Sequence, residues 1–140
     1  MRLRIVTPFE IVVDEDRVSA LRAEDASGCF GILPRHADFL TSLAISVVSW
    51  TGAGGAVRHC AVRGGVFSVT AGRDVAIATR EAIPGDDFAT LDEVVLERFR
   101  ADSEIEREQH VESTRLQLIA IRQIMRRLRP EGRGAPTRLA

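Results

Sequence analysis

The chain has 140 residues, of which 45% are hydrophobic and 28% are charged, and all 19 of its basic residues are arginines. This composition is that of a globular domain with enough apolar residues for a core, and it excludes general disorder. The 20 acidic residues bring the formal net charge to −1, which argues against a protein that mainly binds nucleic acid. Because the chain lacks lysine, it has no Schiff-base nucleophile.

The sequence favours a protein of the reducing cytoplasm. The stretch before Pro8 is too short for a secretory leader. No apolar run approaches the roughly 20 residues that cross a bilayer. Cys29 and Cys60 are its only cysteines. We expect both to be free thiols, with a disulfide between them as the less favoured alternative.

Residues 1–86 are predicted to form a β-sandwich domain of antiparallel strands. Apolar and polar residues alternate over residues 18–24, which is the period of a half-buried strand. Glycine-rich turns separate short apolar runs at intervals of about ten residues, as in sandwiches and barrels. The expected strands cover residues 3–7, 11–13, 18–24, 45–50, 57–62, 66–69 and 75–79.

Residues 87–130 are predicted to form a helical domain, because they contain no glycine and no proline before Pro130. Residues 131–140 contain two glycines and a proline, and we expect them to form a flexible tail. Apolar residues recur at helical spacing, namely Leu91, Val94, Val95 and Phe99 in the first half and Leu116, Ile119, Ile124 and Leu128 in the second.

The helical domain is predicted to be a hairpin of two helices. Thr90 with Glu93, and Ser103 with Glu106, have the spacing of capping boxes that begin helices. The polar composition around the second pair places the turn within residues 101–104. One continuous helix is the alternative, because no glycine or proline enforces a break there.

Charge is sorted along the helical part. Residues 89–112 hold eight acids and three bases, whereas residues 113–140 hold seven bases and one acid. Acids near the start and bases near the end of a helix complement its dipole, and opposite charge also favours packing of two helices on each other. The same distribution gives a basic, all-arginine helix suited to forked contacts with the carboxylates of an acidic partner.

No pattern of catalytic or metal-binding residues is visible. His36, His59 and His110 are far apart in the sequence, and Cys60 beside His59 in a strand would point to the opposite face. The chain has no GxSxG elbow, and its glycine-rich stretches lack the Lys-Ser/Thr of a phosphate-binding loop. We therefore predict no catalytic residue, metal or cofactor, and a binding or regulatory role.

Three stretches follow the order and spacing of one known family. Residues 27–37 contain a loop motif of the form G-x-x-G-I-x-P-x-H-A. Residues 61–69 contain a Gly-Gly strand element, and residues 75–87 contain a last strand with an exit into the helices. Together, across about residues 3–129, these stretches resemble the epsilon subunit of bacterial F-type ATP synthases.

The resemblance implies a ten-stranded β-sandwich followed by a two-helix domain, in a non-catalytic subunit of the rotating central stalk. Such a subunit binds the gamma subunit and the c-ring, helps to couple ion flow to ATP synthesis, and regulates ATP hydrolysis through its C-terminal helices. These helices transiently meet the alpha and beta catalytic subunits. The implied location is peripheral, at the cytoplasmic face of the bacterial inner membrane, with no direct membrane insertion and no nucleic acid.

By the same resemblance, Cys29, Phe30, Gly31 and His36 form a loop that contacts the stalk and the c-ring. Glycines let a loop present its backbone closely to a partner, which supports this assignment. A hydrogen bond from His36 that braces the loop, and simple core packing by Phe30, are the alternatives.

The resemblance also implies a basic contact surface on the inhibitory helix, with a solvated basic face as the alternative. Its residues are Arg122, Arg126, Arg127 and Arg129.

Three positions depart from the family pattern, and the first is Ser46, which stands where the family often carries glycine. Family members that bind ATP carry (I/L)-D-x-x-R-A at the first helix, and Val95 stands here in place of the arginine. Weak or absent ATP binding is therefore expected. Cys29 occupies a position where an acidic residue is common, which suggests a divergent or alternate member of the family.

Two other functions remain open on the sequence. A free-standing ligand-binding β module with a helical dimerisation arm would form a homodimer without other subunits. A small hydrolase would use Cys29 or Cys60 as its nucleophile.

Overall fold

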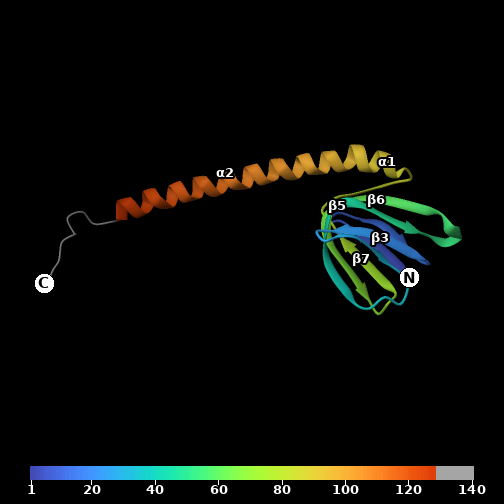
Figure 1. Cartoon of the computed structure of the whole chain (residues 1–140). Coiled ribbons are helices and arrows are strands. Elements are labelled where there is room, and N and C mark those ends of the chain that lie inside the picture. The colour runs from blue at the N-terminus through green and yellow to red at the C-terminus, as the bar shows by residue number, and fades with distance from the viewer. Residues whose placement is uncertain (129–140) are drawn as a thin grey trace. The chain divides into compact units, whose positions relative to one another are not determined.

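The computed structural model describes residues 1–128, and eight strands form its N-terminal part (Figure 1). These strands confirm the predicted β-sandwich. In the sheet they follow the order β2-β1-β7-β6-β5-β3-β4, with β8 pairing with β6, and only β1 and β7 run parallel. The strands are β1 (Arg2–Val6), β2 (Ile11–Glu15), β3 (Ala20–Asp25), β4 (Gly28–Ile32), β5 (Phe39–Thr51), β6 (Val57–Thr70), β7 (Asp74–Ala78) and β8 (Ala82–Gly85).

Strands β5 and β6 are long, with 13 and 14 residues, and they pair with each other along their length. The first half of β6 also pairs with β8 and the second half with β7. Gly64 and Gly65 lie between these halves with φ angles of 70° and 121°, which favour glycine. The separate strands predicted at 57–62 and 66–69 are therefore one strand, because these glycines let pairing with β5 continue. The resemblance implied ten strands, whereas residues 1–128 form eight.

The main core lies between the two layers of the sandwich. Phe67 is its largest fully buried side chain, and Trp50 is also buried, with 3% of its surface exposed. Alternate residues of β1, β6 and β7 supply much of the rest, as the period of a strand requires. The buried side chains include Leu3, Ile5, Leu21, Ile32, Val48, Cys60, Val62, Val69, Val75 and Ile77.

The helical part begins with α1 (Phe88–Thr90), continues through a π-helical turn, η2 (Leu91–Val95), and ends in α2 (Leu96–Leu128). The N-cap is Asp87, whose carboxylate accepts hydrogen bonds from Ala89 N at 3.1 Å and Thr90 Oγ1 at 2.7 Å. The predicted capping box, in which Thr90 itself is the N-cap, is therefore wrong. The short side chain of Asp87 accepts a hydrogen bond from a free N–H in the first turn of the helix, that of Ala89.

The C-terminal helical part is confirmed, but the predicted turn within residues 101–104 is absent. The helix α2 runs without interruption from Leu96 to Leu128. Asp102 and Ser103 are weak helix formers, and without glycine or proline they do not end a helix. Within residues 1–128 the alternative of one continuous helix therefore holds in place of the hairpin.

The chain divides into two units, residues 1–101 and a second unit that begins at Asp102. The boundaries predicted from composition, 1–86 and 87–130, stay predictions. The predicted tail at 131–140 and Arg129 lie outside the described residues. No helix within residues 1–128 has the length and apolar character needed to cross a membrane.

Candidate interaction surface

Three of the predicted contact residues lie in a strand rather than in a loop. Cys29, Phe30 and Gly31 belong to β4, whose pairing with β3 extends to Gly28. Cys29 and Gly31 are exposed, whereas the intervening Phe30 is half-buried and contacts Phe67 edge-on at a centroid distance of 5.2 Å. The two sides of β4 thus differ, with Phe30 packed on Phe67, and the partner contact of Phe30 stays a prediction.

The turn that leads into β4 is held by one carboxylate. Asp25 accepts hydrogen bonds from Ser27 Oγ at 2.5 Å, from Ser27 N at 2.9 Å and from Thr41 Oγ1 on β5 at 2.9 Å. These bonds, first of all that of the Ser27 side chain, lower the pKa of Asp25 below its usual value. Asp25 therefore fixes the turn against β5.

His36 lies in the connection between β4 and β5 and is half-buried. Its Nδ1 lies 2.7 Å from the carbonyl oxygen of Ala37, and its ring contacts Phe39 edge-on at 5.8 Å. The same connection is tied to the β6–β7 turn, because Asp38 accepts a hydrogen bond from Ala71 N at 2.9 Å. This geometry is that of the loop-bracing alternative for His36.

One outer face, on β5, β6, β7 and β1, was not predicted from the sequence. The strand register aligns Leu40 with Ser68 and Ala76 in one row, and Ser42 with Val66 and Ala78 in the next. All of these side chains point away from the core, since their neighbours Phe67 and Ile77 point into it. We call Leu40, Ser42, Val66, Ser68, Ala76 and Ala78 the small-residue face.

The small-residue face is exposed and apolar at its centre. Leu40 is 72% exposed and Val66 is 51% exposed. Its border on β1 is charged, where Arg2 Nε lies 3.0 Å and Arg4 3.6 Å from the carboxylate of Asp14. An apolar centre with a charged rim is the usual anatomy of a protein–protein interface. The sequence carries one signal of this face. The outward-pointing residues within 75–78, Ala76 and Ala78, are apolar, whereas a face exposed to solvent would carry charged residues at these positions.

The predicted basic contact residues that the structure describes have exposed side chains. Arg122, Arg126 and Arg127 lie on α2 within the second unit and are exposed, while Arg129 lies outside the described residues. Val95, which replaces the arginine of the ATP-binding pattern, packs against buried residues of the first unit.

The second cysteine is a core residue. Cys60 is fully buried, and burial raises the pKa of its thiol to about 12, so it is not an activated nucleophile. Its neighbour His59 contacts Ser49 through Nδ1 at 2.7 Å. Among residues 1–128 no three His, Cys, Asp or Glu side chains are grouped as metal ligands would be.

Comparison with known proteins gives the family. Residues 1–85 match the family described as the ATP synthase delta/epsilon chain, β-sandwich domain. The chain belongs to this family. Its similarity to individual epsilon chains extends into the helical part as well.

An epsilon chain named ATP synthase epsilon chain 2 from Paraburkholderia xenovorans (strain LB400) is 47% identical over 131 residues, covering 93% of this chain and 94% of the relative. A protein of the same name from Cereibacter sphaeroides is 41% identical, covering 91% and 88%. Among solved structures, a chain in the Euglena gracilis mitochondrial ATP synthase, OSCP/F1/c-ring, has a TM-score of 0.56 and 26% identity. The match covers 59% of this chain and 51% of that chain.

Proposed function

We propose that this epsilon chain is a non-catalytic subunit of the central stalk, which binds the gamma subunit through the small-residue face. The observation that carries the proposal is the exposed apolar centre of that face on a sandwich of the epsilon family. Short side chains such as Ser42, Ala76 and Ala78 let a partner approach the sheet closely. In this location the chain transmits rotation between the c-ring and the catalytic head.

The c-ring contact in this proposal involves the outward side of β4 and the neighbouring connection. Cys29 and Gly31 supply exposed positions, and Asp25 fixes the turn beside them. Phe30 and His36 hold this region to the core through their contacts with Phe67 and Phe39. The complex then lies at the cytoplasmic face of the inner membrane, with this chain peripheral.

Regulation is the third part of the proposal. The exposed arginines of α2 meet acidic segments of the alpha and beta subunits and restrain ATP hydrolysis. Contacts of this kind between exposed charges are screened within about 8 to 10 Å at physiological ionic strength. Replacing Arg122, Arg126 and Arg127 by Ala is therefore expected to relieve the restraint most strongly at low salt. The relatives named epsilon chain 2 support assignment to an alternate synthase.

Co-expression with the gamma subunit of the same organism tests the proposed function. A stable complex of the two chains in size-exclusion chromatography is the expected result. A homodimer of this chain alone, without affinity for gamma, would instead support the ligand-binding β module.

A further inference from the structure

The start of the helical part contributes to a second core within residues 1–101. Leu91, Leu96 and Phe99 are buried, with exposed fractions of 4%, 2% and 0%. They pack with Ala61 of β6, and the surrounding partly buried residues come from β5, β8 and η2. Deep burial of these side chains is typical of a core and unlike a loosely attached arm.

The π-helical turn explains how these three side chains reach the same surface. Leu96 N donates to Leu91 O, five residues earlier. In a regular α-helix two residues five apart point about 140° away from each other. The wider π turn brings them closer to one side, and Phe99, three residues after Leu96, continues that side in α2. Single π turns inside helices occur frequently at functional sites.

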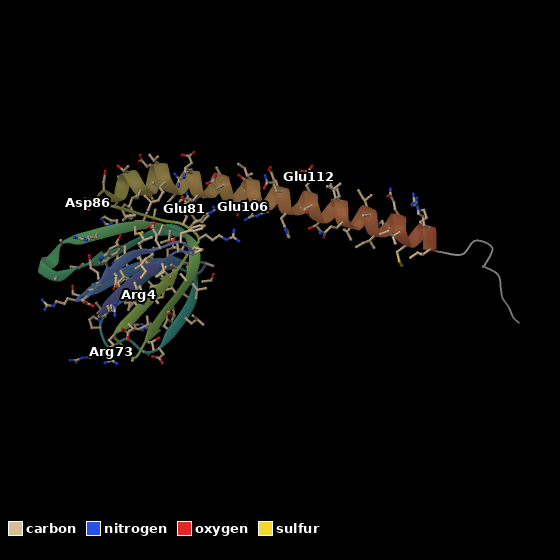
Figure 2. All side chains as sticks on the ribbon, turned by 180° about the vertical axis from the view of Figure 1, so that it is seen from behind. Arg4, Arg73, Glu81, Asp86, Glu106 and Glu112 are labelled. Carbon is tan, nitrogen blue, oxygen red and sulfur yellow. The ribbon has the colours of Figure 1, made fainter. Side chains whose placement is uncertain are left out.

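A charged contact fixes the same segment to the strands. Arg98 donates to Glu81 Oε1 at 2.6 Å, and Glu81 Oε2 lies 3.9 Å from Arg63 of β6. Figure 2 labels Glu81 beside the start of the helical part. The main chain of Glu81 is held in place as well, because its carbonyl oxygen accepts a hydrogen bond from Arg63 N at 3.0 Å. Glu81 therefore links β6, the connection before β8, and α2.

We propose that residues 88–101 are a fixed helical segment of the sandwich, oriented by the positioning residue Glu81, and that the movable regulatory arm of this chain begins at Asp102. The arm itself rests on the proposed regulatory function. The fixed segment rests on the buried side chains, the π turn and the Glu81 contacts. Regulation then requires no exposure of the apolar surface beneath Leu91, Leu96 and Phe99.

Hydrogen–deuterium exchange of the isolated full-length chain tests the fixed segment. Amides of residues 91–101 are expected to be protected together with β6. Phe99→Ala is expected to accelerate their exchange more than tenfold, because it removes a buried ring. The matched control Ile105→Ala, at a 53% exposed position of the same helix, is expected to leave it unchanged. Unprotected amides in residues 91–101 of the wild-type chain would overturn the proposal.

Variants of the charged contact test the positioning role. Arg98→Gln and Glu81→Gln are each expected to accelerate exchange of residues 91–99 about two- to fivefold, the range for a partly exposed ion pair. Arg98→Lys keeps the charge and is expected to lie closer to wild type. In the assembled synthase, Glu81→Gln is expected to shift the salt dependence of ATP hydrolysis. An unchanged profile together with unchanged exchange would refute the role of Glu81.

These measurements separate the proposal from the proposed function. Exchange in the isolated chain reports on the fixed segment whether or not gamma binds. Loss of gamma binding with a protected segment would therefore contradict only the stalk assignment, and an unprotected segment with intact gamma binding would contradict only this inference.

Discussion

Gly65 of β6 lies directly against the carbonyl group of Ala78 at the end of β7. A Cβ at Gly65 would overlap the Ala78 oxygen and come within 3.0 Å of Thr79 Cα. Gly65 also has a φ of 121°, which side chains rarely adopt. This close approach brings Val66 and Ala78 side by side on the small-residue face.

Gly65→Ala is therefore expected to destabilise the protein by at least about 3 kcal/mol, because backbone strain and a backbone clash add. Gly28→Ala is a matched control, since Gly28 has a φ of 125° but nothing within 4 Å of its Cβ position. Strain alone predicts about 1 to 3 kcal/mol there. Urea unfolding measures both. Equal losses for the two variants would show that the Ala78 contact is unimportant.

Trp50 donates its indole N–H to Glu15 Oε2 at 2.5 Å, and Glu15 Oε1 also pairs with Arg58 at 3.0 Å. Glu15→Ala leaves the buried indole without this acceptor and is expected to cost about 1 to 3 kcal/mol. Glu15→Gln retains an acceptor oxygen and is expected to cost less. Unfolding followed by the fluorescence of this single tryptophan compares them. A larger loss for Gln than for Ala would contradict the hydrogen-bond account.

The pKa of Asp25 is lowered by the hydroxyl of Ser27 and by Thr41. A carboxyl with a lowered folded pKa contributes stability above its ordinary value of 3.8, and this contribution is lost as pH falls through the folded pKa. Ser27→Ala removes the largest cause and is expected to raise the pKa of Asp25 toward the ordinary value. An NMR titration of the Asp25 carboxyl measures the change. An identical pKa in both proteins would show that the hydroxyl does not stabilise the carboxylate.

The two thiols are expected to differ sharply in reactivity. Cys29 is exposed, whereas Cys60 is buried with a pKa raised to about 12. Ellman's reagent at pH 8 is expected to modify one thiol per native chain and two per unfolded chain. The Cys29→Ser variant is expected to show no rapid native reaction. Rapid modification of Cys60 in that variant would contradict its place in the core.

Much of the sandwich is predictable because strand alternation separates buried from exposed residues, as in residues 18–24 and 75–79. The continuity of β6 was not predictable in the same way, because Gly64 and Gly65 look like a turn until their φ angles and pairing with β5 are known. The prediction of a continuous helix was similarly ambiguous, since polar residues near 102 are compatible with either a turn or a solvent-exposed helix.

The interaction surface was harder still. Loop motifs directed attention to Cys29 and His36, but the small-residue face depends on the register of three successive strands, which the sequence does not specify. Ala76 and Ala78 look unremarkable until the register places them beside Ser68 and Val66, with Leu40 next in the same row as Ala76. The π turn was equally hidden, because helical periodicity assumes regular spacing between Leu91 and Leu96.

Co-purification with the gamma subunit of the same organism tests the small-residue face most directly. The experiment compares two variants, in each of which one exposed valine is replaced by glutamate. Val66 on this face and Val57 outside it are 51% and 55% exposed. We predict that Val66→Glu weakens gamma binding at least tenfold, since it buries an unpaired charge at the interface, while Val57→Glu binds as wild type and both retain the wild-type melting temperature. Wild-type gamma binding by a folded Val66→Glu variant would contradict the assignment of this face.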